Sequence, residues 1–201
     1  MDWTIPGTVL KGPREDVESS IRQIEGMFLA GGIVRSQVAA ATGLEPHAVQ
    51  NWVKRGFLSN PVGKRYSLRQ FSRIAIINTL KSVMPMERIC GLLSYINGQL
   101  NDESDDLIDD TLLYFMFLRL ASQARHIGGT RSWDDVIPEI LERYDEPVPG
   151  ARERIDRVLR IMLTAWIAAC TMRQAERMLI ELNEIQNQER EHQNHTAKEI
   201  D

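Results

Sequence analysis

Residues 46–55 place hydrogen-bonding and cationic side chains at a spacing that suits recognition of nucleic-acid bases. A helix turns about 100° per residue, so one face of a helix over this range carries His47, Gln50, Asn51 and Lys54. Val49, Trp52 and Val53 fall together on the opposite face, which we expect to pack in the core. Asparagine and glutamine amides can bond to the N6 and N7 groups of adenine. We therefore expect Gln50 and Asn51 to read bases, with His47 as a further candidate.

Cationic side chains flank this predicted helix along the chain. Residues 34–73 contain seven Lys and Arg side chains and one acidic side chain, although the whole chain has a formal net charge of -4. A basic segment within an acidic protein is typical of a nucleic-acid contact, although a solvated surface has the same composition. The predicted contacts to the DNA backbone are Arg35, Ser36, Lys54, Arg55, Lys64, Arg65 and Tyr66. Tyr66 also fits a core tyrosine, and Arg69 and Arg73 fit solvated helix charges.

Two short helices and a hairpin are expected to position these side chains. Residues 34–42 form a helix that Gly43 ends, and Pro46 then suits the first position of the helix over 46–55. The small Ala39, four residues before Gly43, permits a close crossing of the two helices. Residues 58–66 follow, and their NPVG sequence indicates the turn of a β-hairpin.

The rest of the chain is predicted to be helical. Further helices are expected at 68–82, 85–97, 107–123 and 151–188. The helix over 107–123 is apolar on nearly all sides, which predicts the centre of a helical core. Near the end of the last helix, apolar side chains repeat at 3-4-3 spacing, at Ala175, Met178, Leu182 and Ile185. This pattern fits a contact with a partner helix and fits packing within the chain equally well.

Residues 33–97 resemble the winged helix of MerR-type regulators in the order of their elements. More closely, the motifs "QNWVKRGFL", "KRYSLRQFSRI" and "LLSYING" make residues 27–121 similar to an uncharacterised bacterial family, a domain of unknown function with a MerR-like DNA-binding fold. The resemblance implies a DNA-binding regulator that acts as a dimer, and it implies no enzymatic activity. The segment "HAVQNWVKR" lacks the tyrosine pair and leading arginine of MerR proteins, so their phosphate contacts are not transferred. Metal sensing is not transferred either, because Cys90 and Cys170 lie elsewhere.

Signatures of catalysis and of membrane insertion are missing from the sequence. It has no Gly-rich phosphate loop and no His-Glu-x-x-His motif, so we expect no enzyme and no cofactor. The apolar runs 112–121 and 161–172 are shorter than the roughly 20 residues that span a bilayer. Two widely separated cysteines fit a reducing, cytoplasmic compartment. His192 and His195 have a metal-ligand spacing but belong to a polar tail, so no metal site is predicted.

The expected fold is mostly α: a winged helix-turn-helix of MerR-like type with one small β-hairpin, then a helical C-terminal region with a long terminal helix. The expected divisions are an N-terminal helix and lead-in (1–32), the winged helix-turn-helix (33–98), a helical core for dimerisation or effector binding (99–190) and a polar tail (191–201). The expected function is that of a sequence-specific, homodimeric transcription regulator on double-stranded DNA, with helix 46–55 in the major groove and hairpin 58–66 as a wing. The alternative is a non-enzymatic protein–protein interaction module that uses the winged helix or the C-terminal helices. The sequence indicates no particular small-molecule effector.

Overall fold

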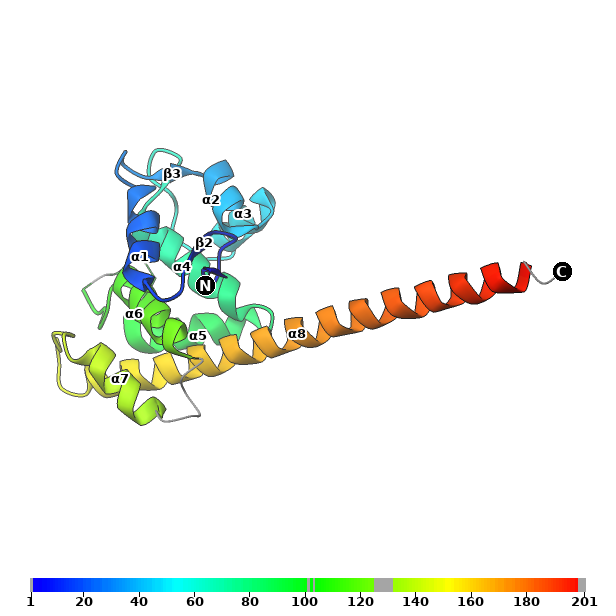
Figure 1. Ribbon diagram of the computed structural model, residues 1–201. Helices are drawn as coiled ribbons and strands as arrows, with labels where there is room; N and C mark the ends of the chain where they lie inside the picture. Colours follow the sequence, from blue (N-terminus) through cyan, green and yellow to red (C-terminus); the bar gives the residue numbers. More distant parts are fainter. Residues whose placement is uncertain (1, 101, 103, 125–131, 199–201) are drawn as a thin grey trace. The chain divides into compact units, whose positions relative to one another are not determined.

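The computed structural model describes residues 2–100, 102, 104–124 and 132–198, with side chains described as far as residue 188. The chain is mostly helical (Figure 1). In chain order, its elements are β1 (Asp2–Thr4), β2 (Lys11–Pro13), α1 (Val17–Gly26), β3 (Ile33–Val34), α2 (Arg35–Thr42), α3 (Pro46–Lys54), β4 (Arg65–Tyr66), α4 (Leu68–Leu80), α5 (Met86–Asn97), α6 (Asp110–Gln123), α7 (Trp133–Leu141) and α8 (Ala151–Lys198). The chain divides into two compact units, residues 1–166 and 167–201.

Helices α4 and α6 form the centre of the first unit, where they lie side by side (Figure 1). Every residue from Phe71 to Ile77 of α4 is buried, and so is every residue from Leu113 to Leu118 of α6. The prediction that an all-round apolar helix forms the core is therefore confirmed. This helix begins later than predicted, because Asp109 is its N-cap and its carboxylate accepts the Thr111 N–H at 2.7 Å.

The first residues of the chain form a strand pair that the sequence did not indicate. Strands β1 and β2 are antiparallel neighbours, and contacts with distant elements fasten the turn between them. The Tyr114 hydroxyl of α6 donates to the Pro6 carbonyl at 2.7 Å, and the Val9 N–H donates to the Ala41 carbonyl of α2 at 2.9 Å. Strands of three residues are too short for a periodic pattern, so only these tertiary contacts define them.

Helices α2 and α3 are joined by the turn that the sequence predicts. Gly43 has a φ of 70°, in the left-handed region that glycine enters at little cost, and its N–H donates to the Ala39 carbonyl at 2.8 Å. Pro46 is the first residue of α3. Val49 and Trp52 of α3 are buried, so the apolar face of this helix packs inward and its polar face is left exposed.

The segment 58–66 contains less β-structure than the predicted hairpin. A single bridge joins Val62 to Arg65 across Gly63 and Lys64, whose φ angles are 56° and 63°. A positive φ at both central positions is the requirement of a type I′ hairpin turn. The ladder extends no further within the segment. Pro61, directly before the bridged Val62, has no N–H that could donate to a further hydrogen bond of the ladder.

Apart from the bridge between Arg65 and Val62, strand β4 pairs with β3 rather than with the other side of its own loop. The two strands are antiparallel, with Ile33 opposite Tyr66 and Val34 opposite Arg65. Because β3 leads directly into α2, this pairing fixes the 58–66 loop next to the first turn of α2 (Figure 1). Helix α2, helix α3 and the loop are thereby held around one surface.

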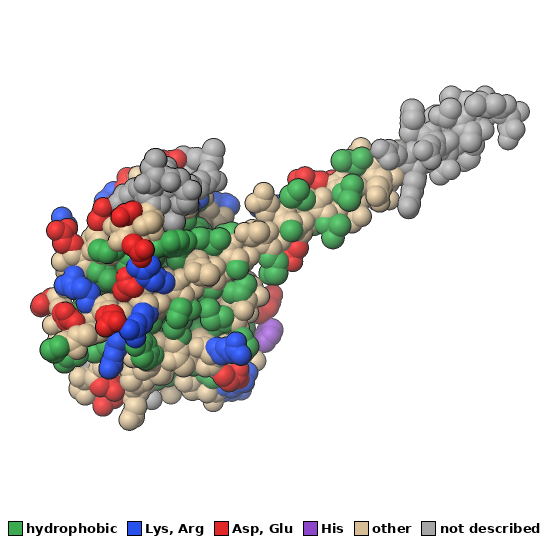
Figure 2. All heavy atoms as spheres, turned by 90° about the horizontal axis from the view of Figure 1, so that it is seen from below, with side chains coloured by type: hydrophobic (Ala, Val, Ile, Leu, Met, Phe, Trp, Pro, Cys, Tyr) green, Lys and Arg blue, Asp and Glu red, His purple; other side chains and the backbone are tan. Residues whose placement is uncertain are grey.

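The second unit, residues 167–201, consists of the later part of α8. From residue 171 to 188 its apolar side chains are exposed, and they include Met172, Met178, Leu179, Ile180, Leu182 and Ile185. Figure 2 shows hydrophobic side chains along this helical segment. Within the described residues, no helix combines the length and the apolar character needed to cross a membrane. The side chains of the predicted polar tail, 191–201, lie outside the described part of the chain.

Candidate nucleic-acid interface

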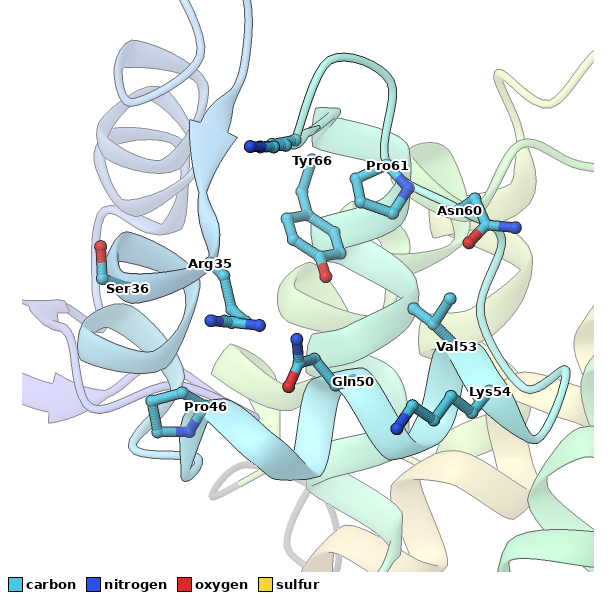
Figure 3. Close-up of a pocket in the computed structure, with 10 residues that line it drawn as sticks. Arg35, Ser36, Pro46, Gln50, Val53, Lys54, Asn60, Pro61 and Tyr66 are labelled. Atoms are coloured by element: carbon cyan, nitrogen blue, oxygen red, sulfur yellow. The ribbon is translucent and has the colours of Figure 1, made fainter.

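A concave surface lies between α2, α3 and the 58–66 loop, and the cavity that it bounds has a volume of about 710 Å³ (Figure 3). The residues that line it are Arg35, Ser36, Pro46, Gln50, Val53, Lys54, Asn60, Pro61, Lys64 and Tyr66. Six of the side chains predicted to contact DNA are among them, contributed by all three segments. The lining contains three cations and no carboxylate. A surface of this composition favours an anionic, hydrogen-bonding ligand.

The cations that line this surface have no internal counter-charge. Within the described part of the chain, Arg35, Lys54 and Lys64 form no ion pair or side-chain hydrogen bond, and all three are exposed. Lys64 is also the one described non-glycine residue with a positive φ, at 63°. A lysine in this conformation costs on the order of 1 kcal/mol relative to glycine. The tight turn requires this conformation, and Lys64 is one of the residues that line the concave surface.

Tyr66 divides between core and surface. Its residue exposure is only 3%, so the ring packs in the core, as one of the two interpretations of the sequence expected. The hydroxyl points toward Arg35 and Gln50 (Figure 3) and makes no hydrogen bond to any described residue. Burial raises the pKa of this hydroxyl, and the Arg35 charge offsets part of the rise. The group therefore remains a protonated donor at neutral pH and faces the concave surface.

His47 and Asn51 lie on the exposed face of α3 but do not line the concave surface. Gln50, which does line it, directs its amide toward Arg35 and the Tyr66 hydroxyl (Figure 3). The predicted polar face of α3 is thus exposed as a whole, while its members differ in surroundings. Gln50 is embedded among cations, and the other two border open solvent.

Two of the side chains predicted to contact the DNA backbone already form contacts within the protein. The Arg55 guanidinium lies 4.8 Å from the centre of the Phe57 ring and 3.3 Å from the Glu87 carboxylate. Arg65 donates to the Gly32 carbonyl at 2.9 Å. Both side chains remain exposed, so a phosphate would have to compete with these contacts or share the guanidinium with them.

Arg69 and Arg73 do not lie on the solvated helix face that their spacing suggests. Arg73 is 6% exposed, and its guanidinium lies 3.2 Å both from the Asp110 carboxylate and from the Phe57 carbonyl that it donates to. Arg69 pairs with Asp106 and with Asp109. Burial raises the pKa of the Asp110 carboxyl, against the pull of Arg73. Acidic side chains at the start of α6 and just before it therefore pair with two arginines of α4. The sequence analysis missed these pairs because 37 residues separate Arg73 from Asp110.

Gln70 holds the 58–66 loop from the inner side. Its Oε1 accepts the Ser67 N–H at 3.0 Å, and the Ser-x-x-Gln sequence of residues 67–70 thus forms a capping box at the start of α4. Its Nε2 lies 3.0 Å from the carbonyl oxygens of Ser59 and Asn60, to which it donates. The capping pattern was visible in the sequence, but the attachment to the loop was not. This attachment keeps Asn60 at the rim of the concave surface.

Metal-ligand types do not gather anywhere among the described residues, where no three His, Cys, Asp or Glu side chains could hold an ion together. Cys90 and Cys170 are free thiols, each partly exposed. The side chains of His192 and His195 lie outside the described part of the chain.

The fold and this surface define a mostly helical protein with a cationic concavity between two short helices and a loop. Residues 33–117 match a family described as Domain of unknown function (DUF1836). The chain is also 30% identical over 109 residues to the Uncharacterized protein YkrK of Bacillus subtilis (strain 168), an alignment that covers 52% of this chain and 47% of that protein. The chain thus spans about half the length of this curated relative. No solved structure matches it. The family match runs from β3 into α6 and includes every residue that lines the concave surface.

Proposed function

We propose that the protein is a sequence-specific, homodimeric transcription regulator that binds double-stranded DNA through a winged helix-turn-helix of MerR-like type. In this proposal α3 enters the major groove and the 58–66 loop lies beside it as the wing. The observation that carries the proposal is the convergence of three cations without internal partners, Arg35, Lys54 and Lys64, on one concave surface. Neutralising phosphates costs such side chains no existing ion pair, so counterion release contributes fully to binding.

The polar face of α3 supports readout of base edges. Gln50, Asn51 and His47 are exposed on a helix of nine residues, and the major groove of B-DNA is about 12 Å wide, enough to admit an α-helix. Gln50 and Asn51 each carry an amide that can pair with adenine through two hydrogen bonds. In this arrangement the cations around Gln50 bind the DNA backbone and fix the helix in register, while the amides supply sequence preference.

The wing is held firmly enough to act as a positioned element. Gln70 and Arg73 of α4 donate to carbonyls of the loop at Ser59, Asn60 and Phe57, and β4 pairs with β3. These bonds leave the tip residues Gly63 and Lys64 outside and exposed. A loop tied at its base with a cation at its tip suits contact with phosphates beside the groove that α3 occupies.

The homodimer rests on the second unit. Ala175, Met178, Leu182 and Ile185 fall within one side of the helix at about 100° per residue, and all four are exposed. A stripe of this kind is stable in water when a second helix covers it. Two copies of α3 would then address two half-sites, as dimeric regulators do. A regulator of this kind acts in the bacterial cytoplasm, where the DNA is.

The same exposed stripe favours the second candidate function, a non-enzymatic protein–protein interaction module. The two candidates differ in what the first unit binds. Selection of bound fragments from a genomic library tests the difference directly. The DNA-binding proposal predicts recovery of fragments that share a sequence motif, and that recovery disappears when Gln50 and Asn51 are both replaced by alanine. Recovery of no fragments, or of fragments without a shared motif, rejects the sequence-specific proposal.

A further inference from the structure

The first turn of α2 opens onto the concave surface without a side-chain cap. Its N-cap residue is Val34, which has no side-chain acceptor, and the first N–H groups of a helix lack partners within the helix. Gln37 uses its side-chain oxygen to accept the Val34 N–H at 3.0 Å, so it does not cap the turn from outside. The positive end of the α2 dipole is thus available at Arg35 and Ser36, both of which line the surface.

A second observation at the same place points to a ligand. The Tyr66 hydroxyl belongs to a residue that is 97% buried, yet it has no hydrogen-bond partner among the described residues and is directed into the concavity (Figure 3). The hydroxyl oxygen itself is not enclosed by protein atoms, so an acceptor in the concavity can reach it. The Arg35 guanidinium, likewise unpartnered within the described chain, points to the same place. Two donors and a helix N-terminus therefore converge on one part of the concave surface.

We infer that Arg35, the Tyr66 hydroxyl and the first turn of α2 form a site for one phosphodiester group of the DNA backbone, an inference that rests on the DNA-binding function proposed above. A phosphodiester presents two charged oxygens and can accept from the guanidinium, the hydroxyl and a backbone N–H together. The surface supplies no carboxylate that would repel it. The hydroxyl remains a donor because burial raises the pKa of Tyr66.

This site fixes the position of α3 along the groove. Tyr66 belongs to β4, which pairs with β3, and β3 leads directly into Arg35 of α2. The backbones of the two donor residues are therefore joined through one short ladder. Gln50 lies beside them (Figure 3), so a phosphate bound here sets which base pair the Gln50 amide reaches.

A double-mutant cycle on the full-length protein tests the inference, with a duplex selected from the genomic library as the probe. Arg35→Gln removes one charge and is expected to lower the slope of log affinity against log salt by about 0.9. Tyr66→Phe keeps the buried ring and removes only a neutral donor, so affinity falls about tenfold while the salt slope stays the same. Because both donors serve one phosphate, the double variant loses less affinity than the product of the two single losses.

The controls make the same chemical changes outside the concavity. Arg22→Gln removes a guanidinium from α1, and Tyr95→Phe removes a hydroxyl from α5; both are expected to leave DNA affinity unchanged. Duplexes with one neutral methylphosphonate at a time locate the phosphate: one linkage per half-site weakens the wild type, and the same linkage has no effect on the Arg35→Gln/Tyr66→Phe variant. Multiplicative losses, or an unchanged affinity of Tyr66→Phe, overturn the inference while DNA binding stands. A wild-type protein that binds no duplex overturns the proposed function itself.

Discussion

Arg35 and Arg73 carry the same guanidinium in opposite surroundings. Arg35 is exposed and unpartnered within the described chain, whereas Arg73 is buried against Asp110 and the Phe57 carbonyl. A buried guanidinium without its carboxylate would carry a large desolvation cost, so Arg73 serves the fold. A solvated one carries no such cost, so Arg35 is free to bind an external anion.

The Arg73–Asp110 pair gives a stability prediction at this scale. Asp110→Ala leaves the Arg73 charge buried without a counter-charge, and we expect the free energy of unfolding to fall by about 3–5 kcal/mol in urea titrations. Glu87→Ala is the matched control, because it removes the carboxylate of the exposed pair with Arg55 and should cost less than about 1 kcal/mol. Equal losses for the two variants would contradict the assignment of Asp110 as the buried partner.

Gln50 gives a specificity prediction. Gln50→Ala removes an amide that lies among the cations of the concave surface, so we expect a loss of about 1–3 kcal/mol for the preferred duplex and little change for unrelated duplexes. Competition binding with both kinds of DNA measures the ratio. Gln23→Ala is the control, since this glutamine is exposed on α1 and lies outside the concave surface. A uniform loss on all duplexes would show that Gln50 contacts the backbone only.

At the scale of elements, α4 connects the wing to the acidic segment before α6. On one side Gln70 donates to the Ser59 and Asn60 carbonyls, and on the other Arg69 pairs with Asp106. Arg73 contacts both sides, through Phe57 and Asp110. The wing therefore owes its position to the first two turns of α4 rather than to a long ladder of its own.

Hydrogen exchange of the wing tests this attachment. Gln70→Ala removes the acceptor of the Ser67 N–H and the bonds to the loop, so we expect faster exchange of the amides in 59–66, measured by mass spectrometry, with the interior of α4 unchanged. Gln37→Ala is matched, because Gln37 also accepts the N–H of its N-cap residue but has no bond to the loop. Unchanged exchange in 59–66 after Gln70→Ala would show that the loop does not depend on this clamp.

The elements that the sequence predicts are those with a local cause. Helical periodicity, Gly43 and Pro46 predict α2 and α3, and the Ser67–Gln70 capping box predicts the start of α4. The turn of the N-terminal strand pair is fastened to distant elements, and β3 pairs with a strand that lies beyond α2 and α3. The turn sequence in 58–66 indicates where the chain reverses direction, which predicts a hairpin. It does not indicate that the strand after the turn pairs with β3.

The same distinction applies to the concave surface. The polar face of α3 follows from helix geometry, so its residue types were predictable. Which cations remain unpaired could not be predicted. The sequence does not show that the acidic segment pairs with Arg69 and leaves Arg35 exposed. The direction of the Tyr66 hydroxyl likewise depends on the β3–β4 pairing, for which the sequence contains no local signal.

At the scale of the whole molecule, the exposed stripe of the second unit predicts self-association. Leu182→Glu places a charge in the centre of the stripe formed with Ala175, Met178 and Ile185, so we expect a dimer to dissociate into monomers in sedimentation-velocity experiments. Asn187→Glu adds the same charge on another side of the helix and should leave the dimer intact. A wild-type protein that sediments as a monomer at micromolar concentration would contradict the dimer.

The salt dependence of DNA binding tests the central claim most directly. The affinity of the selected duplex is measured at several salt concentrations for the wild type, Lys54→Ala and Lys64→Ala, with Lys81→Ala, at the C-cap of α4 and outside the concave surface, as the control. If the unpaired cations bind phosphates, the wild-type affinity falls steeply with salt and each of the first two variants lowers the slope by about 0.9, while the control keeps the wild-type slope. Undetectable binding, or binding with the same slope in all four proteins, would contradict the account.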